Sequence, residues 1–186
     1  VSDDLEIIVT NTTEAAIAYD PSCKADDMPP ASFPAKLAQV LHTRWAAGKP
    51  GVIVLACELI DHNGEELLRI MNQYVSDWGW EDEFAQWMAN DCTVCTTLVD
   101  TIVPGRIRDP KEAAAVAERL GYEDPFLAVR EPFQMWGIQG DESLAEKLPF
   151  VKAGLPGVFV TPDVNPYKMR KVRILNGAHT AFVPGS

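Results

Sequence analysis

A continuously apolar run, Gly51-Val-Ile-Val-Leu-Ala56, is followed by a polar turn over residues 58–64 and by an amphipathic segment over residues 65–78. An apolar run without polar alternation is typical of a strand that is covered on both faces of a parallel sheet. The segment after the turn carries apolar side chains at helical spacing: Leu67, Leu68, Ile70, Met71 and Tyr74. The sequence therefore predicts a β-strand followed by an α-helix here.

The same alternation continues on both sides of this unit. Upstream, residues 5–10 predict a buried strand and residues 35–47 a helix, separated by a Pro-rich loop over residues 21–34. Downstream, residues 82–88 predict a short helix and residues 93–103 a strand. Strand, helix, strand, helix, strand is the order of a doubly wound α/β domain, and we expect that fold class.

The chain after residue 108 predicts four further elements. Asp109-Pro110 begins a helix, with Asp as the N-cap and Pro at the first helical position, and Gly121 ends it. Residues 126–138 and 158–161 are strand-like. After two prolines, residues 167–182 predict a helix that opens a new layer.

Composition excludes several classes of protein. The 186 residues hold 27 acidic and 16 basic side chains, a formal net charge of −11. Nucleic-acid binding needs a surplus of Lys and Arg, so this charge argues against it. No apolar run approaches the ~20 residues of a membrane helix, and the first residues do not resemble a signal peptide. We expect neither nucleic acid nor membrane as a partner.

Four cysteines are too few for a disulfide scaffold in a chain of this length. Cys92 and Cys95 have CxxC spacing, which a redox pair or half of a zinc site also shows. The surrounding run is apolar and no second CxxC follows, which favours structural cysteines and no metal. The low cysteine content suits a reducing, cytoplasmic setting.

Polar side chains follow the first two predicted strands, where ligands bind in doubly wound sheets. Asn11, Thr13, Glu14 and Glu58 are the candidates there for binding the ribose or carboxamide of a cofactor. Helix capping by the threonines, with Glu14 in the first turn, is the alternative. The sequence contains no GxGxxG fingerprint of pyrophosphate binding.

The densest group of functional side chains lies in residues 167–180. Four basic residues fall within six positions, and Asn176 and His179 follow them. At about 100° per residue, Lys171, Asn176 and His179 share an arc of roughly 140° on a helix. They span about 12 Å along its axis, so convergence on one small group needs the full length of the lysine. A solvated basic face with a structural histidine is the alternative.

This segment resembles the signature of the mannitol dehydrogenase family, the polyol-specific long-chain dehydrogenases. The signature has a Lys, an Asn five positions later and a His three beyond it, here Lys171, Asn176 and His179. Further segments resemble the family in the same order: residues 10–16, 29–36, 57–61, 63–64, 98–100, 102–105, 131–133 and 136. The resemblance implies the later part of a Rossmann-type NAD-binding domain over residues 1–162. Residues 163–186 would begin an all-α C-terminal substrate domain, so that the chain is the middle of a longer protein.

The resemblance also implies a metal-independent, NAD-dependent oxidoreductase acting on a small sugar acid or polyol. The most similar branch reduces a hexuronate, tagaturonate, to altronate; fructuronate and neutral ketoses such as fructose are alternatives. Lys171 would be the general acid or base, and Asn176 and His179 would hydrogen-bond the reacting oxygen. Arg170 or Arg173 would bind the substrate carboxylate, unless they pair with the protein's own acidic residues.

Two positions depart from the family pattern. Thr96 stands where the family has an Asn that holds the substrate oxygen, and Thr101 stands where many relatives have Arg. A Thr hydroxyl still donates one hydrogen bond, so Thr96 remains a substrate-binding candidate. Two other classes stay open: a noncatalytic domain with the same fold, and a zinc-dependent alcohol dehydrogenase that uses Cys92 and Cys95.

Overall fold

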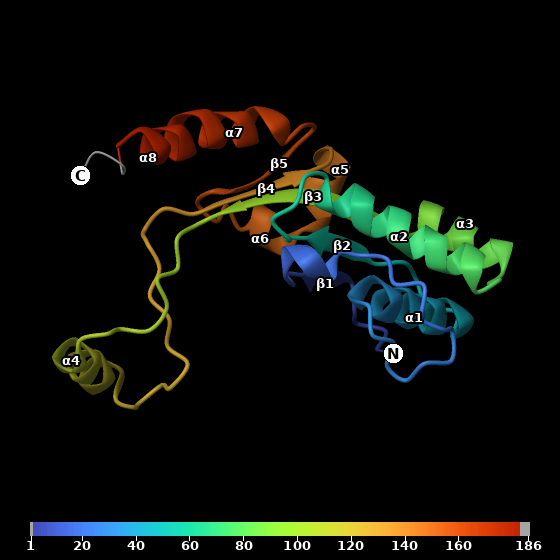
Figure 1. Ribbon diagram of the computed structural model, residues 1–186, viewed down its shortest axis with the longest axis horizontal. Coiled ribbons are helices and arrows are strands. Elements are labelled where there is room, and N and C mark those ends of the chain that lie inside the picture. The colour runs from blue at the N-terminus through green and yellow to red at the C-terminus, as the bar shows by residue number, and fades with distance from the viewer. Residues whose placement is uncertain (1, 183–186) are drawn as a thin grey trace.

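The computed structural model describes residues 2–182, with the backbone alone at residues 175 and 179, and has one mixed sheet flanked by helices (Figure 1). Its strands lie in chain order: β1 (Ile7–Thr10), β2 (Ile53–Ala56), β3 (Thr93–Asp100), β4 (Met135–Gln139) and β5 (Val158–Thr161). β1, β2 and β3 pair in parallel, as do β4 and β5, whereas β4 runs antiparallel to β3. The predicted α/β class is confirmed, with one antiparallel pairing that the sequence does not reveal.

Three helices cover one face of the sheet: α1 (Phe33–Ala46), α2 (Asn63–Asp77) and α3 (Asp82–Asn90). Their apolar stripes bury Leu41, Leu67 and Phe84 in one core cluster. Val54 of β2 belongs to the same cluster, which shows that alternate residues of this strand face these helices. The three helices begin and end within three residues of the predicted limits.

Two short helices that the sequence analysis missed cover the other face. They are α5 (Glu142–Lys147) and α6 (Pro149–Lys152), and they bury Leu144 and Leu148 against Leu55 and Ile138. Because Val54 and Leu55 are buried on opposite faces, β2 is covered on both sides. This is what its continuous apolar run predicts.

The C-terminal helix runs over β4 and β5 on the same face as α2 (Figure 1). It consists of α7 (Asn165–Arg170), a π-helical turn (Lys171–Asn176) and α8 (Gly177–Phe182), without interruption. The Tyr167 ring packs 4.7 Å from the Phe159 ring of β5. Gly137 leaves space for this contact, since a Cβ there would lie 3.2 Å from Phe159. The predicted helix over residues 167–182 is confirmed.

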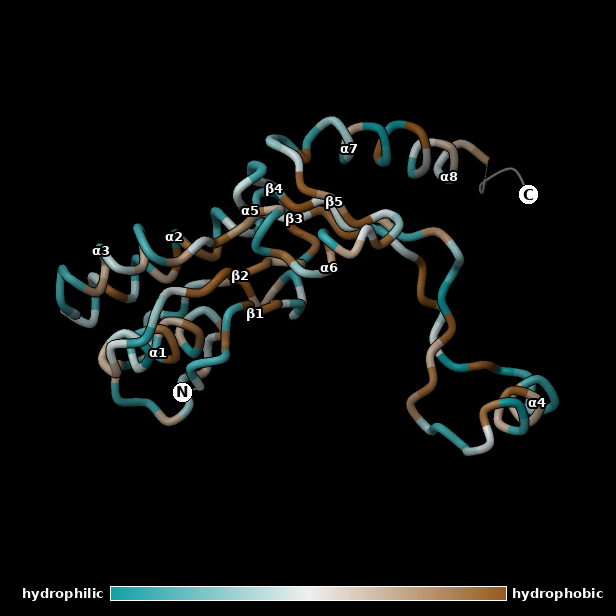
Figure 2. The backbone as a smooth tube through the Cα atoms, turned by 180° about the vertical axis from the view of Figure 1, so that it is seen from behind, coloured by the Kyte–Doolittle hydropathy of each residue, from teal (hydrophilic) through white to brown (hydrophobic). Residues whose placement is uncertain are grey.

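Between β3 and β4 the chain leaves the sheet as an arm that ends in α4 (Pro110–Leu120), far from the other elements (Figures 1 and 2). The caps are as predicted: the Asp109 carboxylate accepts from the Lys111 amide at 2.9 Å, and Gly121 has φ 80°. The strand predicted over residues 126–138 is wrong for its first nine residues. They lie in the arm, beyond the end of β3, where they form the Gly105–Val129 bridge and a backbone hydrogen bond from Glu131 to Ile102 but no strand.

Hydrophobic segments concentrate in the strands at the centre of the molecule, and hydrophilic ones in the loops (Figure 2). None of the described helices combines the length and the apolar character that a membrane span requires.

Candidate functional site

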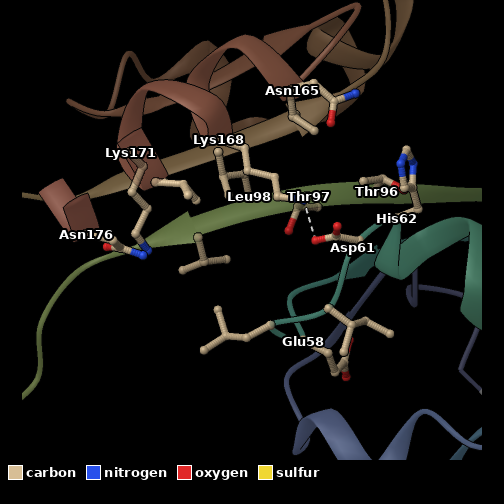
Figure 3. Close-up of a pocket in the computed structure, with 15 residues that line it drawn as sticks. Glu58, Asp61, His62, Thr96, Thr97, Leu98, Asn165, Lys168, Lys171 and Asn176 are labelled. Atoms are coloured by element: carbon tan, nitrogen blue, oxygen red, sulfur yellow. Dashed lines mark hydrogen bonds and ion pairs between the residues drawn. The ribbon is translucent and has the colours of Figure 1, made fainter. Parts of the chain in front are cut away.

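A cleft opens at the carboxyl ends of β2 and β3, between the β2–α2 loop and the C-terminal helix (Figure 3). In open α/β sheets this is where ligands bind. Its walls come from the loop (Glu58, Leu59, Ile60, Asp61, His62), from β3 (Thr96, Thr97, Leu98, Val99) and from the helix (Val164, Asn165, Lys168, Lys171, Val172, Asn176). Three segments that are distant in sequence therefore form one site.

Asn63 fixes the loop against β3. Its buried amide nitrogen donates to the carbonyls of Glu58 (2.9 Å) and Thr97 (3.0 Å), and its amide oxygen accepts from the backbone of Gly64 and Thr97. Gly64 lies so close to β3 that an added Cβ would be 2.4 Å from the Cys95 backbone. The Asn63-Gly64 pair thus determines where α2 begins and where the loop lies.

Glu58 ties the ends of β1 and β2 together. Its buried carboxylate accepts from the Thr10 hydroxyl at 2.9 Å, and from the Thr12 hydroxyl and amide at 3.0 Å each. These contacts hold the first loop and the second loop in one arrangement beside the cleft. Because three donors occupy the carboxylate, its observed contacts are those of a loop anchor.

Lys171 lies at the end of β3, where its Nζ pairs with the buried Asp100 carboxylate at 2.7 Å. Only 24% of the lysine side chain is exposed. This ion pair with a buried carboxylate holds the lysine amine at the end of β3. Lys171 therefore presents an oriented ammonium at the border of the cleft.

Asn176 joins Lys171 in lining the cleft because of the π-helical turn between them. In an α-helix, residues five apart lie about 140° from each other. In a π-helix the hydrogen bond spans five residues, so residues i and i+5 lie one turn apart on the same side. Figure 3 shows both side chains directed towards the strand side of the helix. Single π-helical turns occur often at functional sites. The His179 side chain lies outside the described residues.

A second lysine spans the cleft. Lys168 hydrogen-bonds and pairs with Asp61 on the facing loop, as the dashed line in Figure 3 marks. The lysine lowers the pKa of the Asp61 carboxyl below its ordinary value. Asp61 is 74% exposed and Lys168 is 29% exposed, so solvent reaches this pair.

Thr96 contributes a buried hydroxyl to the floor of the cleft. Among the described side chains, its Oγ1 has no hydrogen-bond partner. Buried polar groups are nearly always satisfied, so an unpaired one beside a cleft is suited to a ligand. Thr101 donates instead to the Phe133 carbonyl at 2.8 Å and is not among the residues of this cleft.

The other predicted site residues lie around the cleft. Arg170 lies with its guanidinium carbon 5.8 Å from the Tyr167 ring centroid and borders a neighbouring groove. Arg173 is exposed and is not among the residues that line the cleft. Asn11, Thr13 and Glu14 are exposed at the end of β1, and Asn11 lines a groove with Cys57.

The cysteines are buried, free thiols. Burial raises the pKa of Cys95 to about 11 and also raises that of Cys92. A thiol with a raised pKa is a poor nucleophile. Among the described side chains, which do not include that of His179, no three His, Cys, Asp or Glu side chains are grouped as metal ligands.

Sequence reasoning missed Asp100, Asp61 and Lys168. Asp100 meets Lys171 across 71 positions and Asp61 meets Lys168 across 107, separations that no local pattern reveals. One signal was available for Asp100: a charged residue that ends an apolar strand lies at the ligand-binding edge of such a sheet. Lys168 was counted in the basic segment, but nothing in the sequence separates it from Arg170 and Arg173.

Known proteins resemble this chain in sequence. Residues 5–152 match the family model described as the mannitol dehydrogenase Rossmann domain. An altronate oxidoreductase from Yersinia enterocolitica is 45% identical over 185 residues, and one from Phocaeicola vulgatus is 42% identical. Each alignment covers 97% of this chain, and the chain spans 38% of the length of these relatives.

Solved structures resemble the fold. A D-sorbitol dehydrogenase in substrate-free form matches with a TM-score of 0.71 at 22% identity, over 96% of this chain and 38% of that one. The Pseudomonas fluorescens mannitol 2-dehydrogenase, in a ternary complex with NAD and D-mannitol, matches with a TM-score of 0.69 at 23% sequence identity. This match covers 96% of this chain and 37% of that one. At these identities the likeness establishes a Rossmann-type fold.

Proposed function

The chain belongs to the mannitol dehydrogenase family, and on that premise we propose that its gene product is an NAD-dependent oxidoreductase acting on a sugar acid. The reaction is reduction of the keto group of a hexuronate, tagaturonate to altronate, and its reverse. The observation that carries this proposal is the oriented Lys171 ammonium, 2.7 Å from Asp100, at the border of a cleft with unused polar groups. The altronate oxidoreductases among the relatives support the choice of substrate.

Residues at this edge of the sheet suit the nicotinamide end of the cofactor. A groove beside the cleft has an apolar wall that includes Val9, Val99 and Met135, and Asn11 adds a side-chain amide. A flat ring that carries a carboxamide needs that combination. Asn11 would hold the carboxamide, while Thr13, Glu14 and Glu58 shape the adjoining loops. NAD supplies the hydride when reduced and accepts it when oxidised.

Lys171 is the proton donor in the direction of reduction. The carbonyl carbon of the substrate receives the hydride, and the oxygen receives a proton from the Lys171 ammonium. Asp100 orients the ammonium, and solvent restores its proton because a quarter of the side chain is exposed. In oxidation, the neutral amine takes the hydroxyl proton.

Three further groups stabilise the charge that develops on the substrate oxygen. Asn176 lines the cleft beside Lys171, and Thr96 has a hydroxyl free to donate. His179, three residues after Asn176, completes the set in the family signature. Donors that are fixed before the reaction stabilise an oxyanion without reorganisation.

The direct test is an assay of the complete gene product that carries residues 1–186. We expect NADH oxidation with tagaturonate and NAD reduction with altronate, with fructuronate, fructose and mannitol turned over more slowly. Activity without added metal, unchanged by a chelator, is expected for a lysine mechanism. Stoichiometric zinc that is required for turnover would overturn it in favour of Cys92 and Cys95.

A further inference from the structure

We propose that Lys168 binds the carboxylate of the sugar-acid substrate and that Asp61 holds this lysine until the substrate displaces it. The inference rests on the proposed function and adds the residue that distinguishes a sugar acid from a neutral sugar. Among the basic side chains of residues 167–180, it selects Lys168 over Arg170 and Arg173.

The geometry of α7 favours Lys168. Residues three apart are neighbours on one helix face, about 5–6 Å between Cβ atoms, so Lys168 lies beside Lys171. Both line the cleft, as does Asn165 one turn earlier. An anion bound at Lys168 therefore lies close to a reacting group bound at Lys171. Arg170 is stacked near Tyr167 at a different groove, and Arg173 does not line the cleft.

The charges in the cleft favour the same lysine. The protein carries a net charge of −11, so an anionic substrate needs a local positive site. Lys171 is engaged by the buried Asp100. Lys168 pairs instead with Asp61, whose carboxylate is 74% exposed on a loop. Exposed ion pairs contribute little net stability, so a substrate carboxylate can replace that of Asp61 at small cost.

Two substitutions give opposite expected results. Lys168→Met removes the partner of the substrate carboxylate, and we expect KM for tagaturonate to rise roughly 10- to 100-fold, the worth of one charge-assisted hydrogen bond. Asp61→Asn removes the competing carboxylate, and we expect KM for tagaturonate to fall. The KM for fructose, which has no carboxylate, changes less than the KM for tagaturonate in both variants. If the Lys168–Asp61 pair had a purely structural role, both substitutions would change KM in the same direction, and they would do so for both substrates.

Equilibrium binding of altronate, measured by calorimetry, tests the lysine without turnover. We expect weaker binding by Lys168→Met, tighter binding by Asp61→Asn and unchanged binding by Lys111→Met, which removes one lysine from the distant α4. Equal affinity of the wild type and Lys168→Met would overturn the inference, as would a selective loss in Arg173→Gln. A protein that binds altronate in this pattern but never reduces tagaturonate would contradict the proposed function alone.

Discussion

Single buried polar side chains set the geometry of the cleft. Asn63 connects the β2–α2 loop with β3 through four hydrogen bonds, and Glu58 connects the loops after β1 and β2 through three. Thr96 lines the same cleft, and its hydroxyl is buried. Asn63 and Glu58 find their hydrogen-bond partners within the protein and stabilise its structure, whereas the buried Thr96 hydroxyl has none among the described residues.

Asn63→Ala should destabilise the fold strongly. It leaves the carbonyls of Glu58 and Thr97 and the amides of Gly64 and Thr97 without their partners in a buried region. We expect a loss of about 3–5 kcal/mol in the free energy of unfolding, measured by urea denaturation. Asn90→Ala, at the exposed end of α3, is the control and should stay within about 0.5 kcal/mol. Equal stability of the two variants would refute the role of Asn63.

Thr96→Val should separate stability from activity. Valine has the same shape without the unpaired hydroxyl, so the free energy of unfolding should rise by up to about 1 kcal/mol. Turnover should fall about tenfold, because one donor to the substrate oxygen is lost. Thr96→Asn restores the residue of the family pattern and should preserve or improve turnover. Equal rates for Thr, Val and Asn would show that position 96 does not contact the substrate.

At the scale of elements, sequence patterns predicted what depends on local periodicity and capping. The strand at β2 and the caps of α4 follow from apolar runs and from Asp109 and Gly121. The same patterns did not predict the elements whose structure depends on contacts between distant parts of the chain. Residues 126–134 are apolar enough for a strand. However, β3 ends at Asp100, opposite Met135, so no strand among the described residues lies beside residues 126–134 to pair with them. The short helices α5 and α6 are below the length at which helical periodicity is recognisable.

The π-helical turn could not be predicted from the sequence either. An arc of 140° between Lys171 and Asn176 assumes an α-helix throughout, and no residue in the sequence signals the wider turn. Both residues line one cleft, as an arc on one broad face allows, but the turn that brings them there is π-helical. The contacts of Asp61 and Asp100 depend on the packing of α7 over the sheet, which periodicity cannot give.

The turn itself can be tested by changing its length. Deleting Ile174 places Asn176 four residues after Lys171, where α-helical winding puts it on the same face, about 6 Å along the axis. We expect this variant to keep kcat within about tenfold. Inserting an alanine after Ile174 misaligns the pair and should lower kcat at least ~100-fold, the cost of losing an oxyanion donor.

Circular dichroism should show the same helix content in both length variants, and Ile174→Ala is the matched control for the side chain. Loss of activity on deletion, with activity retained on insertion, would contradict the proposed alignment.

At the scale of the whole molecule, the sheet brings the ends of β2 and β3 to one edge, and the helix after β5 returns over them. This return carries Lys171 to Asp100 and Lys168 to Asp61, so the cleft joins residues 58 to 176 of the chain. Two lysines, each paired with a carboxylate, thereby lie together at one cleft of a protein with a net charge of −11, where the proposed anionic substrate would bind. The arm with α4 takes no part in this cleft.

Proton transfer by Lys171 is tested most sharply by the kcat of Lys171→Ala in the complete gene product. We expect kcat for tagaturonate reduction to fall by ~10²–10⁴, the usual worth of general acid–base catalysis. Binding of NADH should change little, and a small primary amine added to the assay should restore part of the rate. Lys111→Ala, on the distant α4, should behave as the wild type. Wild-type kcat in Lys171→Ala would contradict the account and would move the proton-transfer role to His179.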